Sequence, residues 1–389
     1  MYIPRIAETM LVESLKSNKI VLILGSRQVG KTTLVKEVMK NRKTVFLNLD
    51  IEMDKARLLA ASRLSPSEAL RYLDSPDFLI IDEAQRLSDS TRIVKGWHDS
   101  DVSARFILLG SSSLDLLNQS AESLAGRDEK LFLPPLLFKE TLCKEKWFPV
   151  RLDSVQSFEM FGEQIKETCF LSMIYGQYPE AVTTEDKEKF LLNLVSDYLF
   201  KDIFQLELIK TPEVIRRMLT LLAYQAGSEV SVNEISKSLS IARATVERYL
   251  ELLEAAFVIF RLPSFGTNPR KEISKTHKVF FWDTGVRNAL LKEFSTNKTR
   301  ADIGALFENW VVAEAAKKNM LNGNRKNLYF WRSKGGSEVD LVIKENETIS
   351  AYEIKWQKEK SIKTAFADNY GVPVKIVNIN NFYPLIDLM

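Results

Sequence analysis

The fold of the first part of the chain is decided by the apolar run Ile20–Leu24 and the segment after it, Gly25–Thr32, which reads GSRQVGKT. This segment fits the pattern G-x-x-x-x-G-K-[ST], and a helix is plausible for Thr33–Met39 behind it. A strand before the pattern and a helix after it are what a phosphate-binding P-loop requires. The glycines let successive backbone N–H groups turn toward phosphate oxygens, and the helix dipole adds partial positive charge.

Two side chains of this segment have predicted roles toward a nucleoside triphosphate and Mg²⁺. Lys31 is expected to reach the β- and γ-phosphates, and the Thr32 hydroxyl to coordinate the metal. The simpler alternative is a glycine turn with a chance lysine. The residues predicted to contact the nucleotide are Gly25, Ser26, Arg27, Gln28, Val29, Gly30, Lys31, Thr32, Thr33 and Ser111.

A second motif weakens that simpler alternative. The apolar run Phe78–Ile81 leads into two carboxylates, Asp82 and Glu83. Continuous apolar residues are typical of a parallel strand covered on both faces. Asp82 is expected to hold Mg²⁺, directly or through water, and Glu83 to polarise the attacking water. The two motifs together predict an enzyme, an ATPase with ATP and Mg²⁺ as its cofactors.

Two further positions are candidates for the γ-phosphate. The strand-like run Phe106–Leu109 leads into Gly110 and three serines, of which Ser111 or Ser112 is a candidate sensor; an ordinary loop or helix cap is the alternative. Arg127 is a candidate cation for transition-state charge, either in its own chain or in a neighbouring subunit. A surface arginine that pairs with Asp128 or Glu129 remains the other interpretation.

The size and composition limit the possible classes of protein. A chain of 389 residues with 45% hydrophobic residues is expected to form two or three packed domains. The net charge of +3 does not indicate general coating of nucleic acid. Two cysteines without metal-like spacing, the lack of an apolar region in residues 1–10 and the lack of a membrane-length run predict a cytoplasmic protein with no membrane association.

The order of patterns along the chain predicts an α/β fold in three parts. Residues 1–145 alternate strands with helices, which predicts a P-loop NTPase parallel sheet that closes with a last strand in residues 131–136. Residues 155–290 are predicted to be a helical and winged-helix region. Residues 300–389 are predicted to be an α/β nuclease-like domain.

The winged-helix prediction rests on two short helices, Val232–Leu239 and Arg243–Ala256, followed by the strand-like residues 258–262 and 278–281. The second helix carries basic residues that are candidates for DNA contact, but also glutamates that would repel phosphates. Because winged helices also dock proteins, DNA and protein partners both remain open. The basic residues assigned to DNA contact are Arg243 and Arg248 on the helix, beside Thr245, and Arg270, Lys271, Lys275 and Lys278 in the wing.

The last part of the chain contains an acidic set in a characteristic order. Glu308 lies in the helical pattern Gly304–Ala316, and Asp340 and Glu353 lie on two strand patterns. Alternate residues of a strand share a face, so Glu338 and Asp340 lie on one face of their strand, and Glu353 and Lys355 lie on one face of the next. Such an oxygen-rich set suits Mg²⁺, with Lys355 placed to activate water. Ordinary cross-strand ion pairs are the alternative.

Taken together, the motifs resemble a large family of bacterial and archaeal AAA-type ATPases, in which a P-loop domain is joined to a C-terminal domain of unknown function. The resemblance also includes Ile3–Arg5, and it implies ATP binding. The C-terminal part looks like the PD-(D/E)xK nuclease fold. The other segments that carry the resemblance are Gly25–Thr33, Ile80–Gln85, Gly110–Ser113, Ser123–Arg127, Phe281–Gly285, Gly304–Asn309 and Glu338–Asp340.

Three functions are compatible with these patterns. The first is an ATP-binding and ATP-hydrolysing switch coupled to a DNA-associated C-terminal module. The second is an ATP-regulated, metal-dependent DNA nuclease. The third is an ATP-driven protein-assembly factor with an inert nuclease-like domain, and a homo-oligomer is compatible with each of the three.

Overall fold

The structure is a computed structural model that describes residues 2–110, 124–199, 212–266, 277–333, 335–357 and 365–389. The chain divides into two compact units, Tyr2–Pro134 and Pro135–Met389. The first contains a five-stranded parallel sheet, and the second contains helices and two smaller sheets, so the mixed α/β fold is confirmed. The regions predicted as the second and third domains both lie within the second unit.

The parallel sheet of the first unit has the strand order β2-β3-β4-β1-β5. Every neighbouring pair in it is parallel. The residues of β1 and β3 are all buried, as the unbroken apolar runs predicted. The strands are β1 (Ile20–Leu24), β2 (Thr44–Asn48), β3 (Phe78–Asp82), β4 (Arg105–Gly110) and β5 (Asp128–Phe132).

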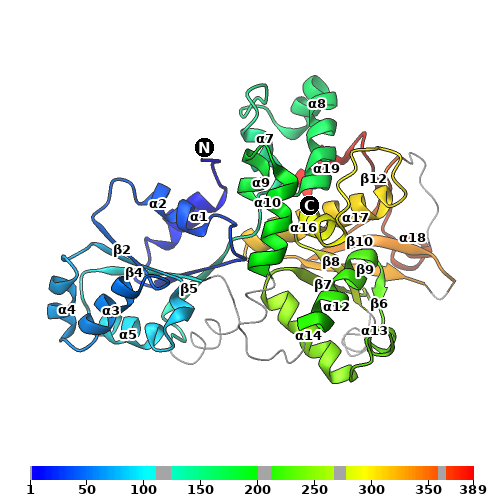
Figure 1. The fold of residues 1–389 in the computed structure, drawn as a ribbon. Helices are drawn as coiled ribbons and strands as arrows, with labels where there is room; N and C mark the ends of the chain where they lie inside the picture. The colour runs from blue at the N-terminus through cyan, green and yellow to red at the C-terminus, as the bar shows by residue number, and fades with distance from the viewer. Residues whose placement is uncertain (1, 111–123, 200–211, 267–276, 334, 358–364) are drawn as a thin grey trace. The chain divides into compact units, whose positions relative to one another are not determined.

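Helices cover both faces of this sheet. Helices α3, α4 and α5 bury one face, where Leu58, Leu70 and Trp97 pack against the strands. Helices α1 and α2 lie on the opposite face (Figure 1). The predicted last strand, residues 131–136, begins and ends earlier as β5, because prolines 134 and 135 cannot donate to a strand ladder. The helices are α1 (Ala7–Ser14), α2 (Lys31–Val38), α3 (Glu52–Ala61), α4 (Pro66–Tyr72), α5 (Ser90–His98) and the 3₁₀ turn Ala84–Arg86.

The second unit begins with a helical region. Within it, α10 is followed directly by a π-helical turn, Leu194–Leu199. Among the described helices, none has both the length and the apolar character to cross a bilayer. The helices are α7 (Phe138–Cys143), α8 (Ser154–Tyr175), α9 (Pro179–Thr183), α10 (Lys187–Asn193), α12 (Pro212–Tyr224), α13 (Val232–Leu239), α14 (Arg243–Ala255) and α16 (Thr284–Leu291).

A small antiparallel sheet, ordered β6-β8-β7, accompanies α13 and α14. Its strands are β6 (Glu229–Val230), β7 (Ile259–Pro263) and β8 (His277–Phe281). The wing residues Arg270, Lys271 and Lys275 lie outside the described residues. Beyond β7, the backbone N–H of Phe265 donates a 2.6 Å hydrogen bond to the carbonyl of Phe330, so this sheet is tied to the C-terminal one.

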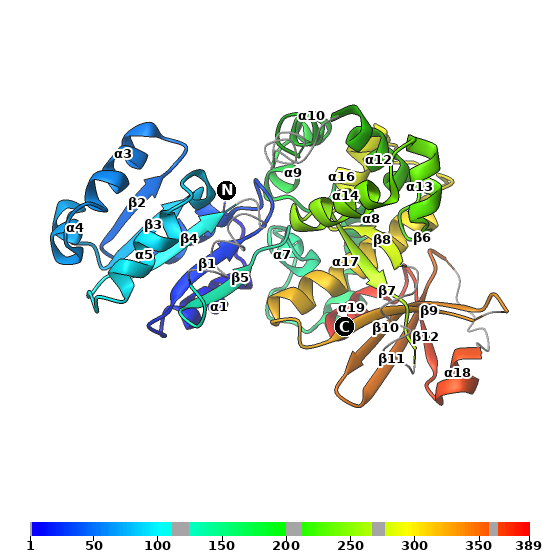
Figure 2. The same ribbon diagram turned by 90° about the horizontal axis from the view of Figure 1, so that it is seen from below.

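The C-terminal sheet has the strand order β12-β11-β10-β9, with β12 parallel to β11 and the other pairs antiparallel. Figure 2 shows α17 near β7 and β8, and α17 packs against both β8 and β11. Phe138, Trp310 and Phe382 are buried together in the shared core. The elements are β9 (Asn327–Arg332), β10 (Glu338–Glu345), β11 (Thr348–Ile354), β12 (Val374–Val377), α17 (Ile303–Leu321), α18 (Ala365–Tyr370) and α19 (Phe382–Leu388).

One motif behind the family resemblance, Phe281–Gly285, serves the packing of the fold. Asp283 is buried and accepts hydrogen bonds from the backbone N–H groups of Gln177 (2.6 Å) and Val286 (3.1 Å). A Cβ on Gly176 would lie 1.9 Å from the Asp283 carboxylate, so glycine is required there. Asp283 therefore joins the end of α8 to the start of α16.

Candidate functional site

The P-loop follows β1 directly and turns tightly against the chain beyond β5. A Cβ on Gly25 would lie 2.2 Å from the carbonyl oxygen of Leu133, so the backbones approach too closely for any other residue. Gln28 and Gly30 have φ angles of 61° and 94°, in the left-handed region. Such a conformation turns consecutive N–H groups toward one side of the loop, where an anion binds.

Lys31 is the first residue of α2 and is 6% exposed. Its Nζ donates 2.9 Å hydrogen bonds to the carbonyl oxygens of Gly25 and Ser26, within the loop itself. The ammonium group is therefore held over the P-loop rather than in solvent. This is the position from which a lysine binds phosphate oxygens as a point charge.

The two predicted magnesium ligands of this site lie together. The Thr32 hydroxyl donates a 2.6 Å hydrogen bond to Oδ2 of Asp82, the buried last residue of β3. The other oxygen, Oδ1, accepts a 2.9 Å bond from the backbone N–H of Glu83. A hydroxyl and a carboxylate oxygen beside an anion-binding loop are suitable ligands for Mg²⁺. The residues present therefore fit ATP and Mg²⁺.

Glu83 lies immediately beyond Asp82 with a left-handed φ of 52°. Its Oε2 accepts a 2.6 Å hydrogen bond from the side-chain amide of Gln85. Gln85 thus orients the carboxylate that was predicted to polarise water. The sequence signal for Gln85 was its place in the quoted run Ile80–Gln85, to which no role was assigned.

Arg5 is a second residue whose role the sequence did not reveal, although Ile3–Arg5 was part of the resemblance. Arg5 is 6% exposed, and its guanidinium donates hydrogen bonds to the carbonyls of Val29 (2.9 Å) and Pro134 (2.8 Å). Val29 lies inside the P-loop and Pro134 follows β5. Arg5 therefore fastens the P-loop backbone from outside the motif.

Arg127 lies far from this site in its own chain. Its carbonyl accepts a hydrogen bond from the N–H of Ile20, at the start of β1, whereas the P-loop follows the other end of that strand. Five strand residues span about 16 Å at roughly 3.3 Å each. The predicted action of Arg127 within its own chain is therefore wrong, and only the neighbouring-subunit version stays a prediction. Ser111 and Ser112, the sensor candidates, lie outside the described residues.

The C-terminal acidic residues converge as predicted. Lys355 Nζ lies 3.2 Å from Oδ2 of Asp340 and 3.6 Å from Oε1 of Glu353. The same Oδ2 accepts a 2.7 Å hydrogen bond from the backbone N–H of Ile354. Burial alone would lower the pKa of Lys355, but Asp340 and then Glu353 raise it above its usual range. Lys355 is therefore held as a cation.

Lys278 of β8 stands in the middle of this cluster, and its assignment to DNA phosphates is wrong. Its side chain is 4% exposed, and its Nζ lies 2.9 Å from Glu308, 2.5 Å from Glu338 and 3.8 Å from Asp340. Burial, followed by the charge of Asp340, raises the pKa of Glu308 to about 7. Among the described residues, no group of three or more His, Cys, Asp or Glu side chains is arranged to hold a metal ion. The carboxylates form a buried ion-pair network around a lysine.

The two exposed arginines of α14, Arg243 and Arg248, remain available at the surface. Two glutamates near them are partly neutralised, because Arg261 pairs with Glu254 at 2.6 Å and Glu247 at 3.3 Å. The repulsion of phosphate expected from these two glutamates is thereby reduced.

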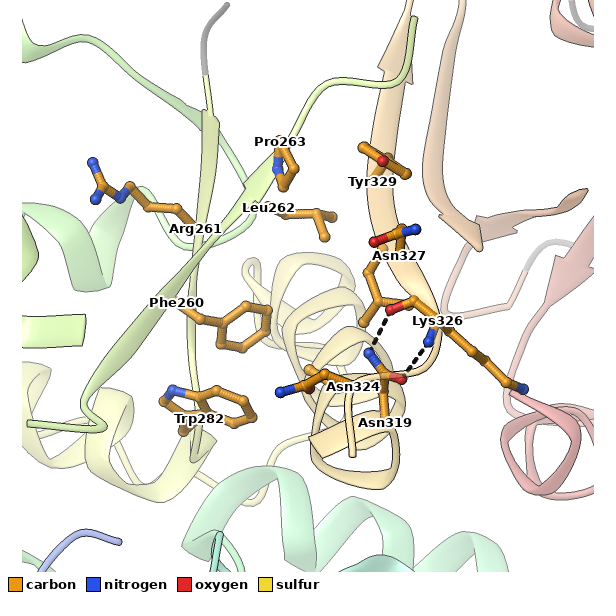
Figure 3. Close-up of a pocket in the computed structure, with 12 residues that line it drawn as sticks. Phe260, Arg261, Leu262, Pro263, Trp282, Asn319, Asn324, Lys326, Asn327 and Tyr329 are labelled. Atoms are coloured by element: carbon orange, nitrogen blue, oxygen red, sulfur yellow. Dashed lines mark hydrogen bonds between the residues drawn. The ribbon is translucent and has the colours of Figure 1, made fainter. Parts of the chain in front are cut away.

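A cavity of about 290 Å³ lies between β7, the end of α17 and the start of β9 (Figure 3). Phe260 and Trp282 line one side, with ring centroids 4.6 Å apart. The Asn319 amide is bonded to the backbone of Lys326 on both its oxygen and its nitrogen. Arg261, which also lines the cavity, forms ion pairs with glutamates of α14. Asn319 and Arg261 therefore already have partners within the protein.

Three family models match successive parts of the chain. Residues 17–142 match the family model of an AAA domain, and residues 167–297 and 303–377 match two domains of unknown function, DUF8612 and DUF4143. An uncharacterized protein of Mycobacterium tuberculosis is 28% identical over 98% of this chain and 80% of its own length. An uncharacterized protein of Methanocaldococcus jannaschii is 29% identical over 94% of this chain and 83% of its own.

Among solved structures, the Walker-type ATPase PABY2304 of Pyrococcus abyssi is similar with a TM-score of 0.53. The match covers 75% of this chain and 96% of that one at 17% identity, which is a likeness of fold. Together with the P-loop geometry, the matched AAA domain supports an AAA-type ATPase that binds ATP.

Proposed function

We propose that the protein is an ATP-hydrolysing switch whose nucleotide state is coupled to a C-terminal module that associates with DNA. The observation that carries the ATPase part is the Thr32–Asp82 hydrogen bond beside the P-loop. It joins the two motifs that a phosphate and its metal need, although fifty positions separate them in the chain. A chance glycine turn would have no reason to meet the end of β3 in this way.

Each residue then has one task. Lys31 binds the β- and γ-phosphates, and Thr32 and Asp82 hold Mg²⁺. When bound, Mg²⁺ supplies positive charge to the phosphate oxygens. Glu83 orients a water molecule and takes its proton on the carboxylate, while Gln85 keeps that carboxylate in place.

The ATPase is tested by measuring nucleotide affinity and turnover in two variants. Lys31→Ala is expected to lose most ATP binding, because it removes the ammonium group assigned to the β- and γ-phosphates. Glu83→Gln is expected to bind ATP as before and to lose hydrolysis by about 10²–10⁴-fold, the usual worth of a positioned base. Lys40→Ala, which replaces an exposed lysine just beyond the end of α2, is the matched control. Unchanged binding and turnover in Lys31→Ala would refute the proposal.

The DNA part is supported by the arrangement of α13, α14 and the β7–β8 pair, which is typical of a winged helix. We expect Arg243 and Arg248 to contact backbone phosphates. Duplex DNA binding by fluorescence anisotropy should weaken with salt, and the slope should fall by about one for each arginine replaced by alanine. Arg63→Ala, an exposed arginine of the other unit, should leave the slope unchanged. Absence of salt-sensitive binding would favour the protein-assembly alternative.

A second candidate function, metal-dependent DNA cleavage, is favoured by the convergence of Glu308, Asp340, Glu353 and Lys355. The test is incubation of DNA with the protein and Mn²⁺ or Mg²⁺. Cleavage that disappears in Asp340→Ala and in Glu353→Ala would support the nuclease. Cleavage that persists in both would indicate a contaminating enzyme.

A further inference from the structure

The cluster of Glu308, Asp340, Glu353 and Lys355, which resembles a nuclease site, also contains the buried side chain of Lys278. This lysine is not part of the nuclease sequence pattern. Lys278 comes from β8, outside the stretch 303–377 that contains the four patterned residues. Its Nζ contacts carboxylate oxygens of Glu308, Glu338 and Asp340 with its side chain 4% exposed. A buried ammonium with three carboxylate partners occupies the position that a cation bound to these same oxygens would take.

The oxygens of Asp340 are engaged on both sides. Oδ1 lies 3.8 Å from Lys278, while Oδ2 lies 3.2 Å from Lys355 and accepts the N–H of Ile354 at 2.7 Å. Mg²⁺ requires near-ideal octahedral oxygen geometry and loses its water reluctantly. An ion placed against Asp340 would also lie beside two ammonium groups, whose like charge repels it.

The backbone of Lys278 is held in place by its neighbours. Its backbone lies in the central strand of the three-stranded sheet, opposite Glu229 of β6 and Leu262 of β7. Three residues further on, Phe281 exchanges two hydrogen bonds with the side chain of Asn309, the neighbour of Glu308 on α17. The strand and the helix that carry the pair are therefore fastened to each other.

We propose that Lys278 replaces the metal ion of the nuclease-like cluster and keeps divalent cations out of it. The inference rests on the second candidate function in one respect: it assumes that these carboxylates correspond to the metal ligands of a nuclease. It predicts that the C-terminal module does not bind metal while Lys278 is in place, and that cleavage by this module requires the lysine to leave.

The test measures Mn²⁺ binding to the full chain, without nucleotide, by calorimetry or electron paramagnetic resonance. The main variant is Lys278→Met with Glu338→Gln, which removes one positive and one negative charge and keeps Glu308, Asp340 and Glu353. It should bind Mn²⁺ at least tenfold more tightly than the unchanged protein, and adding Asp340→Asn should abolish the gain. If this variant does not fold, as judged by circular dichroism, Lys278→Gln with Glu338→Gln keeps a hydrogen-bond donor toward Glu308.

Two outcomes would overturn the inference. One is Mn²⁺ binding by the unchanged protein that Asp340→Asn abolishes and that the double variant does not improve. The other is a folded double variant with no gain in binding. DNA cleavage is measured separately: Mn²⁺ gained without cleavage upholds the role of Lys278 and refutes the nuclease candidate alone.

Discussion

Arg127 donates a 2.6 Å hydrogen bond from its Nε to Oδ1 of Asp99, at the end of β1 that lies away from the P-loop. The guanidinium holds the pKa of the Asp99 carboxyl below its usual range. Both side chains are partly exposed. Arg127 therefore lies at the end of the sheet opposite its own P-loop. From there it can contact a nucleotide only if that nucleotide is bound by a neighbouring molecule.

Arg127→Ala should leave ATP affinity unchanged, since the residue does not reach its own P-loop. If Arg127 completes a neighbouring site, the variant should lose hydrolysis by about 10³-fold or more. Mixing it with Lys31→Ala should restore turnover, because the second chain supplies Arg127 to the first chain's intact P-loop. Turnover in the mixture that equals the sum of the two separate variants would contradict action between subunits.

Arg5→Met should destabilise the P-loop although the residue lies twenty positions before it. Loss of a buried, charged donor leaves the carbonyls of Val29 and Pro134 without those bonds, at a cost of about 3 kcal/mol. We expect a lower melting temperature for the Tyr2–Pro134 unit and weaker ATP binding. The exposed Arg63→Met provides the control. Equal melting curves for both variants would show that Arg5 does not fasten the loop.

Much of this site was predictable because its signals are local. The P-loop spacing and the apolar run before Asp82 predicted two strands of the parallel sheet, β1 and β3, which β4 separates. Arg5 carries no such signal, because its partners depend on how residue 5 packs against residues 29 and 134. Lys278 was predicted at an exposed wing, since its sequence neighbours are basic. Its burial depends on β8 meeting α17 and β10, which no periodicity of one strand reveals.

Gly25→Ala should abolish nucleotide binding by distorting the loop. The added Cβ would meet the carbonyl oxygen of Leu133 at 2.2 Å, and that backbone is bonded to Leu24 by a 2.7 Å hydrogen bond, so neither side can move easily. Gly96→Ala is the matched control, because a Cβ there meets nothing within 4 Å and a helix gains about 0.5–1 kcal/mol from the exchange. Calorimetric ATP titration distinguishes the two. Normal affinity in Gly25→Ala would show that the close approach is not needed.

The stability of the Pro135–Met389 unit should depend on pH through Glu308. Its folded pKa of about 7 is raised above the ordinary 4.5, so the folded state binds the proton more tightly than the unfolded state. The stabilising contribution is full below pH 4.5 and is lost as the pH rises through about 7. A shift of this size corresponds to at most about 3 kcal/mol.

Glu308→Gln removes this contribution while it preserves the shape of the side chain. Unfolding of the full chain is measured by calorimetry at several pH values between 5 and 8. Stability should fall more steeply with rising pH in the unchanged protein than in the variant. The difference should centre near pH 7, because burial and the charge of Asp340 keep the folded carboxyl protonated up to about that pH, although Lys278 favours its ionised form. Glu345→Gln, an exposed glutamate of β10, should follow the unchanged protein. Parallel curves for Glu308→Gln and the unchanged protein would mean that the carboxyl is already ionised at pH 5, with Lys278 as its permanent partner.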